Sequence, residues 1–560
     1  MRSVGSWVQT FLTLGGTFST AEFTGPSIRG NGVTYQGAQN ASGYTDYFLS
    51  IPFAQPPVDS LRFKPPVAWS QSGTDTVINA TTYGPSCPQG WADSSSDTSE
   101  DCLTLHIWKP SYVTEKLPVM VWIYGGGFYF GTARGYEGWN IVQPSITIGK
   151  PVIYVALNYR TGIFGFPPGT ASAKAGALNL GLKDQRLALE WVQKNIEYFG
   201  GDKTKVTLFG QSAGAISTAY QSMYKGGDIG GVFRGMIMQS GSPSSKHVPP
   251  ADDPVQEKAY QFIVNATGCA SSSDTFECLR SAPFDVLQKA NQDVFQLPPQ
   301  WKGPDQGPVL GPVLAPGDDF LPELPSVSIH AGRYAKLPLI NGDVKDEGTV
   351  FINQTTPETE KNVTDWLLFQ EPGLYFGISN ETAVAELLKL YPADPAAGSP
   401  YGTGDETFGA AAQYKRLASL VGDLIFEASR RDFVRTATKD GVDVWSYSFN
   451  TSIIQLDSSR DVLGVQHTAE NTFVFHTLTK VTGGATIPDY FAKVEDAVFN
   501  YWINFAYNLD PNPTSSSYPY WPKYGNNATL ISIGEEFSLI SDTYRAEGIE
   551  YIINTPSLYN

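Results

Sequence analysis

The sequence predicts an α/β fold, in which helices cover both faces of a central, mostly parallel sheet and large helical insertions extend from it. Short β-branched and aromatic runs alternate with segments of helical spacing. The runs 118–124 and 152–157 are almost continuously apolar, as in strands buried on both faces of a parallel sheet. Glycine-rich or polar loops follow several of these runs, and active sites on such sheets lie at the carboxyl ends of the strands.

The chain of 560 residues contains no internal repeat, low-complexity linker or long charge run that would mark a domain boundary. We therefore expect a single domain over residues 22–560. Residues 1–21 begin with a basic Arg2, continue through an apolar stretch and end in Ser19-Thr-Ala21, a pattern typical of a secretory signal peptide. The alternative is a flexible amino-terminal arm.

The charge and hydropathy of the chain limit the kinds of partner that it can have. A formal net charge of -17 at pH 7 argues against a nucleic-acid partner, because a phosphate backbone is bound by a basic surface. After the amino terminus, no apolar stretch reaches the roughly 20 residues of a membrane-spanning helix. We therefore expect a soluble protein without a transmembrane segment.

The four cysteines suggest two local disulfides by their spacing, Cys87 with Cys102 and Cys269 with Cys278. A zinc site is not expected, because neither pair is CxxC and no histidine lies beside them at ligand spacing. No metal or organic cofactor is predicted. Glycosylation sequons support a secreted chain, and they lie at Asn40, Asn79, Asn265, Asn353, Asn362, Asn380, Asn450 and Asn527.

The amino-terminal part predicts short strands at 32–35 and 47–51, a proline-rich surface stretch, and a strand within 99–108 that contains a structural His106. Strand 118–124 then runs into Gly125-Gly-Gly127, a loop that can deliver backbone N–H groups to a developing oxyanion. Strand 152–157 and a helix over 182–199 follow. Strand, helix and strand in this order imply right-handed parallel crossovers.

The next strand, 206–209, breaks at Gly210, and a helix is predicted from Ala213 to residue 224, so that Ser212 lies on the turn between them. Glycines two residues before and after Ser212 have the spacing of a nucleophile elbow, where larger side chains would collide with the neighbouring strand and helix. The Ala213 amide would then point to the site of an oxyanion.

The carboxyl-terminal half predicts further strands and helices. A buried strand over 233–239 precedes an irregular insertion, and strand 337–342 ends just before Glu347, a candidate carboxylate. His467 lies in a loop that follows a predicted strand. The remaining predicted elements are helices at 382–392, 409–437 and 490–505 and a strand at 442–449.

A set of motifs in a fixed order resembles the type-B carboxylesterase/lipase family of the α/β-hydrolase superfamily, which includes cholinesterases and secreted fungal lipases. The matching motifs are Pro52-Phe-Ala-x-Pro-Pro57, Leu61-Arg-Phe63, Ser99-Glu-Asp-Cys-Leu103, Trp122-Ile-Tyr-Gly-Gly-Gly-Phe128, Asn158-Tyr-Arg160, Asn179-Leu-Gly-Leu-Lys-Asp-Gln185, Phe199-Gly-Gly-Asp202, Gly210-Gln-Ser-Ala-Gly-Ala215, Asp346-Glu-Gly-Thr349, Gly464-x-x-His467-x-x-Glu470 and Trp521-Pro522.

Carried over to these positions, the resemblance implies Ser212 as nucleophile, His467 as general base and then acid, and Glu347 as the carboxylate that orients the histidine. It implies an oxyanion hole made by Gly126, Gly127 and the Ala213 amide. The order serine, acid, histidine along the chain agrees with this fold family. The competing candidates for the base are His476, which follows an apolar run, and His247, whereas no feature favours His330.

Two departures from the family pattern bear on the substrate. Gln211 stands before the nucleophile where the family often has glutamate, which argues against a cationic substrate. The loop between Cys87 and Cys102 has only fourteen residues and no apolar face, whereas interfacial activation on lipid droplets needs an amphipathic flap. This loop favours an esterase of soluble or partly soluble esters.

The leading hypothesis is a secreted serine carboxylic-ester hydrolase that acts through an acyl-enzyme on a small-molecule ester, as a monomer or homodimer. The alternative is an acyltransferase that passes the same acyl group to another alcohol. A lipase of long-chain acylglycerols and a non-catalytic adhesion protein are less favoured, the latter because all three triad positions are filled.

Overall fold

The structure is a computed structural model of the chain. It describes residues 25–560 except 72, 74, 91–96, 113, 295–309, 369–377, 379, 485, 514–517, 556, 557, 559 and 560. The expected signal peptide at 1–21 lies outside the described residues, as does the middle of the loop between Cys87 and Cys102.

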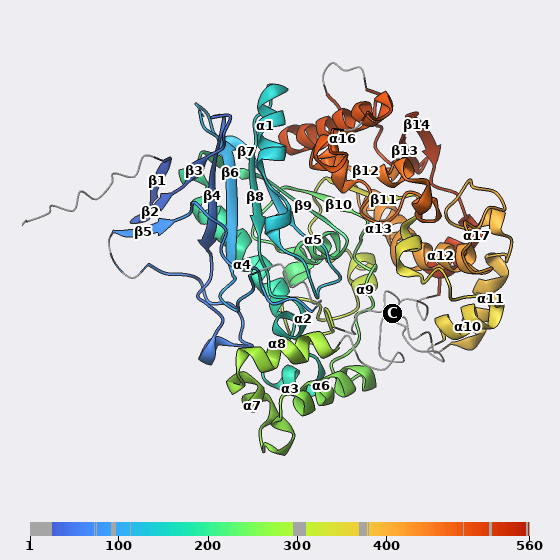
Figure 1. The fold of residues 1–560 in the computed structure, drawn as a ribbon, viewed down its shortest axis with the longest axis horizontal. Coiled ribbons are helices and arrows are strands. Elements are labelled where there is room, and N and C mark those ends of the chain that lie inside the picture. The colour runs from blue at the N-terminus through green and yellow to red at the C-terminus, as the bar shows by residue number, and fades with distance from the viewer. Residues whose placement is uncertain are drawn as a thin grey trace, which may run out of the picture.

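The main sheet has eleven strands among the described residues, in the spatial order β14-β13-β12-β11-β10-β9-β7-β8-β6-β4-β3 (Figure 1). The strands from β8 to β13 in this row run parallel, and β14, β6, β4 and β3 pair antiparallel at the two ends. Their bounds are β3 Ala38–Gln39, β4 Thr45–Pro52, β6 Thr104–Pro110, β7 Leu117–Ile123, β8 Ile153–Leu157, β9 Gly201–Gln211, β10 Gly235–Gln239, β11 Leu339–Val344, β12 Val444–Phe449, β13 Thr529–Ile533 and β14 Ser538–Ser541.

A small sheet precedes it, with β2 (Val33–Gln36) between β1 (Ser27–Gly30) and β5 (Thr76–Asn79). Helices lie on both sides of the main sheet, with α1 (Trp139–Thr147) and α16 (Asp489–Asn508) on one side and α4 (Leu180–Asn195) and α5 (Ala213–Met223) on the other (Figure 1). This is the predicted α/β architecture.

Two helical insertions extend from the sheet. The first contains α6 (Pro254–Ala266), α7 (Thr275–Ser281), α8 (Phe284–Asp293) and α9 (Pro325–His330). The second contains α10 (Glu360–Leu367), α11 (Glu381–Leu390), α12 (Tyr414–Gly422) and α13 (Ala428–Lys439), and its own apolar cluster includes the last long helix, α17 (Ala546–Ile553). The shorter helices are α2 Gly162–Gly165, α3 Gly169–Lys174, α14 Asn471–Val474 and α15 Leu478–Val481.

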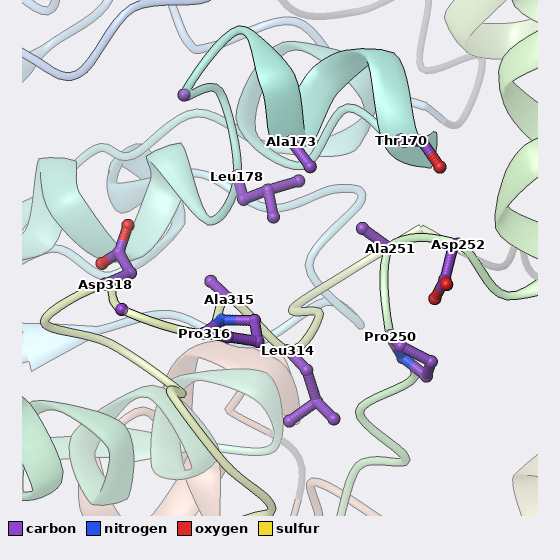
Figure 2. A pocket seen from close by; sticks show the side chains of 12 residues that line it. Thr170, Ala173, Leu178, Pro250, Ala251, Asp252, Leu314, Ala315, Pro316 and Asp318 are labelled. Atoms are coloured by element: carbon purple, nitrogen blue, oxygen red, sulfur yellow. The ribbon is translucent and has the colours of Figure 1, made fainter.

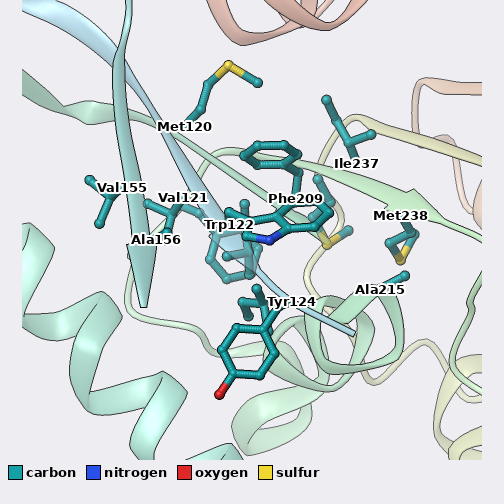
Figure 3. Close-up of a cluster of buried hydrophobic side chains, with 14 of the residues drawn as sticks. Met120, Val121, Trp122, Tyr124, Val155, Ala156, Phe209, Ala215, Ile237 and Met238 are labelled. Carbon is teal, nitrogen blue, oxygen red and sulfur yellow. The ribbon is translucent and has the colours of Figure 1, made fainter. Parts of the chain in front are cut away.

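The central strands are held by a continuous apolar core. Every residue of β7 is buried, and the Trp122 ring lies 4.8 Å from the rings of Phe209 on β9 and Phe475 (Figure 3). A strand that is buried on both faces exposes no side chain to solvent, and its sequence is therefore a continuous apolar run.

The structure differs from the predicted elements in several places. The helices of the first insertion, the helices α1, α3 and α17 and the short strands β1 and β5 were not predicted. The helix predicted over 409–437 is interrupted by a π-helical segment, Asp423–Glu427, between α12 and α13. Strands β13 and β14 were not predicted, since they are short and β14 is mostly exposed and begins and ends with serine.

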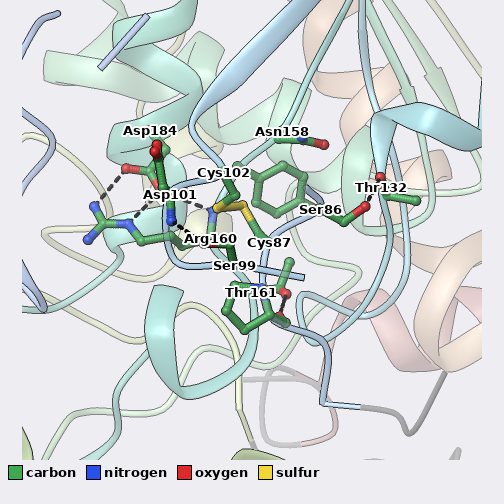
Figure 4. Close-up of a disulfide and its surroundings, with 12 residues drawn as sticks. Ser86, Cys87, Ser99, Asp101, Cys102, Thr132, Asn158, Arg160, Thr161 and Asp184 are labelled. Carbon is green, nitrogen blue, oxygen red and sulfur yellow. Dashed lines mark hydrogen bonds and ion pairs between the residues drawn. A yellow bond between two sulfur atoms is a disulfide. The ribbon is translucent and has the colours of Figure 1, made fainter. Parts of the chain in front are cut away.

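The two disulfides have the pairing that the cysteine spacing suggests, Cys87 with Cys102 and Cys269 with Cys278. Figure 4 shows the first of them near a buried ion pair between Arg160 and Asp184, whose closest atoms lie 2.7 Å apart. Among the helices of the described residues, none is long and apolar enough to cross a membrane.

Candidate active site

Ser212 occupies the sharp turn between β9 and α5. Its φ of 55° and ψ of -128° lie outside the helical and extended regions that non-glycine residues normally adopt. A Cβ on Gly210 would lie 2.4 Å from the Gly214 carbonyl oxygen, and a Cβ on Gly214 would lie 2.0 Å from the Ile123 carbonyl oxygen. The turn therefore requires glycine at both positions and presents a half-buried serine at the end of β9.

The triglycine loop that follows β7 packs directly against this turn. A Cβ on Gly125 would lie 2.9 Å from the Cβ of Ser212. Gly126 and Gly127 have φ values of +112° and +61°, which favour glycine. Among the described residues, no hydrogen-bond acceptor is paired with the amides of Gly126, Gly127 or Ala213. These amides are thus available beside Ser212, as an oxyanion hole requires.

Glu347 and His467 meet at the carboxyl ends of neighbouring strands. Glu347 begins a short 3-10 helix, Glu347–Phe351, directly after β11, and His467 lies in the loop between β12 and α14. The His467 Nδ1 is 2.5 Å from the Glu347 Oε2, and the Val344 N–H donates to Oε1 of the same carboxylate at 2.8 Å. With Glu347 ionised, we assign the hydrogen of this contact to Nδ1, which leaves Nε2 with its lone pair.

The site is buried, and burial shifts the acidity of its groups. Burial lowers the pKa of His467 to about 4, opposed by the charge of Glu470. The imidazole is therefore neutral near pH 7 and can accept a proton. Burial raises the pKa of Glu347, while the Ser240 hydroxyl and the Val344 N–H lower it by donating to the carboxylate. Burial and the charge of Glu347 raise the pKa of Glu470 to about 7.

Gln211, the residue before Ser212, contacts His467. Within the described part of the chain, no hydrogen bond joins the Ser212 hydroxyl to His467; instead the Gln211 side-chain Nε2 lies 3.2 Å from the His467 Nε2. Catalytic hydrogen bonds often tighten only when substrate binds. The arrangement still brings all three predicted triad residues to one edge of the sheet.

Two aromatic rings enclose the histidine. Phe351, from the 3-10 helix of Glu347, has its ring centroid 5.2 Å from that of His467, and Phe426, from the π-helical segment, lies 4.7 Å away. Both contacts restrict rotation of the imidazole, and both exclude water from its faces.

Asp346, beside Glu347, fixes the loop of His467. One of its oxygens accepts from the Val465 N–H at 2.9 Å, and the other accepts from the Tyr401 N–H at 2.8 Å and the Ser399 hydroxyl at 2.9 Å. Asp346 and Glu470 both stand in the motifs of the sequence, but nothing in their spacing indicated these contacts. Phe426 had no sequence signal, because its position depends on the π-helical segment.

Three other histidines considered from the sequence have partners away from this site. His106 is buried in β6 and accepts the Ser50 N–H at 2.9 Å, in agreement with a structural role. His330 pairs with Asp432 at 2.9 Å. His476 lies 3.4 Å from Glu495 and packs against the edge of Phe499. His247 lies in the segment between β10 and α6.

A cavity of about 470 Å³ opens between α3 and two loops near residues 250 and 315 (Figure 2). Small apolar side chains line most of it, and Thr170, Asp252 and Asp318 add polar atoms. None of the candidate site residues lines this cavity. Among the described residues, no cluster of histidine, cysteine and carboxylate side chains has the arrangement of a metal site.

Comparisons with known proteins identify the family of the chain. The model of the Carboxylesterase family matches residues 20–552. Secreted lipase 1 of Botryotinia fuckeliana is 36% identical over 93% of this chain and 91% of its own length. Secreted triacylglycerol lipase LIP1 of Gibberella zeae is 35% identical over 92% and 88%. The crystal structure of Aspergillus niger EstA superposes with a TM-score of 0.82 at 28% identity, over 96% of this chain and 99% of that structure. The chain therefore belongs to the carboxylesterase family and is a serine hydrolase with the α/β-hydrolase fold.

Proposed function

We propose that the protein hydrolyses carboxylic esters through an acyl-enzyme, with Ser212 as nucleophile, His467 as general base and Glu347 as the carboxylate that orients it. The observation that carries the proposal is the 2.5 Å contact between His467 Nδ1 and Glu347 Oε2, beside a serine held in a strained turn. A hydroxyl of ordinary acidity needs such a base in order to attack a carbonyl.

The chemistry proceeds in two halves. His467 Nε2 takes the proton of the Ser212 hydroxyl as its oxygen attacks the ester carbonyl, and the imidazolium then protonates the leaving alcohol. Water repeats the attack on the acyl-enzyme with the same base and releases the acid. The amides of Gly126, Gly127 and Ala213 stabilise the oxyanion of each tetrahedral intermediate, where each donor is worth about 3 to 4 kcal/mol.

The proposed substrates are soluble or partly soluble esters. The short, polar loop between Cys87 and Cys102 supports this choice, since it lacks the apolar face of an interfacial flap. The second candidate is a lipase of acylglycerols, which the names of the two fungal relatives favour.

We also propose that the protein is secreted. The two disulfides support this compartment, as do relatives that are named secreted lipases. The glycosylation sites remain predictions. Asn79, Asn265, Asn353, Asn380 and Asn527 are exposed, whereas Asn450 is half-buried and its Nδ2 already donates to the Ser532 hydroxyl at 2.6 Å.

Hydrolysis of p-nitrophenyl esters of increasing chain length tests the proposal. The wild type should release a burst of nitrophenol, and an alkyl phosphonate should block one site per chain. Ser212→Ala should fold normally, lose turnover and resist labelling. A folded wild type that hydrolyses no ester and takes up no phosphonate would overturn the proposal.

The two substrate classes are separated by an emulsion assay. An esterase turns over tributyrin below its solubility limit and gains nothing when droplets form. A lipase shows a jump in rate at that limit and prefers long acyl chains.

A further inference from the structure

Gln211 is the last residue of β9 and is fully enclosed by the site, with 2% of its surface exposed. Its Nε2 lies 3.2 Å from the His467 Nε2, which is the nitrogen that must receive the serine proton in the proposed function. Its Oε1 lies on the other side, toward the triglycine loop, 3.1 Å from where a Gly125 Cβ would stand. The amide nitrogen therefore faces the base.

The chemistry of this contact depends on the protonation of the histidine. Nδ1 donates to Glu347, so neutral His467 has a lone pair on Nε2 that can accept an N–H from the Gln211 amide. When Nε2 is protonated, two N–H groups face each other and the hydrogen bond is lost. A hydrogen bond made only to the neutral form disfavours the charged form.

We propose that Gln211 is a positioning residue that holds His467 neutral and oriented in the free enzyme, and thereby sets the acidic limit of ester hydrolysis. This inference rests on the proposed function. The Ser212 hydroxyl replaces the Gln211 amide as the partner of Nε2 when substrate binds, so the amide positions the base without taking part in the proton transfer.

Other groups around His467 act in both directions. The charge of Glu470 favours the imidazolium, while burial, to which the packed rings of Phe351 and Phe426 contribute, favours the neutral ring. The Glu347 carboxylate lies against Nδ1. Farther out, Asp346 bonds the histidine loop, and Asp343 and Glu427 pair with the buried Arg430. Among the described residues, only Gln211 makes a hydrogen bond with His467 Nε2.

Two substitutions of Gln211 test this hydrogen bond, one by removing the N–H donor and one by replacing it with a carboxylate. Gln211→Met keeps a similar length but has no N–H donor, so the acid limb of kcat/KM should move up by about half a pH unit to one unit, the equivalent of one ordinary hydrogen bond. Gln211→Glu places a carboxylate that accepts from the imidazolium, so its limb should move up by about one to three units. The pH at the midpoint of the acid limb should increase in the order wild type, Gln211→Met, Gln211→Glu.

The control is Gln143→Glu on α1, which adds the same charge outside the site. The Gln143 oxygen accepts from the Asn40 side chain at 3.3 Å, a role that a carboxylate keeps. This variant should have the acid limb of the wild type. Initial rates of p-nitrophenyl butyrate hydrolysis, quenched in alkali before nitrophenol is read, give kcat/KM across the acidic range.

A second measurement does not depend on turnover. The chain has 5 histidines, so ¹³Cε1-histidine NMR can follow the titration of each, with His467 assigned from its loss in His467→Gln. The midpoint of the His467 titration should rise in the order wild type, Gln211→Met, Gln211→Glu. If one Gln211 variant fails to fold, the other still gives the direction of the shift.

The outcomes distinguish this inference from the proposed function. Equal His467 midpoints and equal acid limbs in all variants would overturn the role of Gln211, as would a uniform loss of rate at every pH. If the wild type hydrolyses no ester and is not labelled by phosphonate, the proposed function fails, while the NMR order still reports on the Gln211 contact.

Discussion

Replacing Gly126 by alanine tests whether the triglycine loop must keep its backbone path. A Cβ there would lie 2.3 Å from the Phe130 carbonyl oxygen and 2.9 Å from its carbonyl carbon, at a φ of +112° that L-residues rarely adopt. The Phe130 N–H donates back to the Gly126 carbonyl at 3.1 Å. The clash therefore falls on the backbone of the loop itself, and relieving it moves the Gly126 and Gly127 amides.

The expected cost is the loss of one oxyanion donor, about 3 to 4 kcal/mol, or a decrease in kcat of about 10²- to 10³-fold. Gly149→Ala is the matched control, because Gly149 also has a positive φ, +70°, but nothing lies within 4 Å of its Cβ. The control should lose only about 1 to 2 kcal/mol of stability and keep its kcat. The assay is burst and steady-state hydrolysis of p-nitrophenyl butyrate, with urea unfolding of each variant. A folded Gly126→Ala protein with the kcat of the control would refute the reasoning.

Three further predictions concern stability. His106, whose Nδ1 accepts the Ser50 N–H, has its pKa lowered to about 3 by burial. Between about pH 6.5 and 3 the unfolded chain therefore binds one proton more than the folded chain, and the free energy of unfolding falls with decreasing pH by up to about 1.4 kcal/mol per pH unit from this residue. In His106→Asn, urea unfolding should show a dependence of the free energy on pH that is smaller by this amount. An unchanged dependence on pH would contradict the prediction. Arg430→Met leaves three buried carboxylate partners without their cation and should lower the free energy of unfolding by about 3 to 5 kcal/mol, whereas an unchanged urea midpoint would show that the pairs contribute little. Replacing both Cys87 and Cys102 by alanine opens a loop with a sequence separation of 15, and the free energy of unfolding should fall by about 3 kcal/mol. A urea midpoint equal to that of the wild type would count against this disulfide.

The sequence predicts the central strands well because their signal is local. A strand buried on both faces must be apolar throughout, so the predicted strand 118–124 nearly coincides with β7, Leu117–Ile123. The same holds for the turn at Ser212, where the glycines reflect close approaches to backbone atoms rather than distant contacts. Candidate triad positions in such local motifs can be proposed without a structure.

The rest depends on contacts between positions far apart in the chain. Gln211 and His467 are 256 residues apart, and Asp346 and Val465 are 119 residues apart, so no periodicity links them. The π-helical segment Asp423–Glu427 is similarly invisible, because a single wide turn has no residue pattern of its own and α-helical spacing continues on both sides of it. Phe426 lies in this segment, and its ring packs on His467.

Asp346 ties the segments that carry Glu347 and His467 to the second insertion. Its carboxylate, next to Glu347, accepts hydrogen bonds from the loop of His467 and from the Ser399–Tyr401 turn. Helices α10, α11 and α12 pack in a separate apolar cluster. A chimaera that exchanges α10 and α11 but retains this turn should thus keep Glu347 and His467 in register. The second insertion and the segments of Glu347 and His467 are thus fastened together at several points, which include the Asp346 carboxylate, the Phe426 ring on His467 and the Tyr414 hydroxyl on the Thr349 carbonyl.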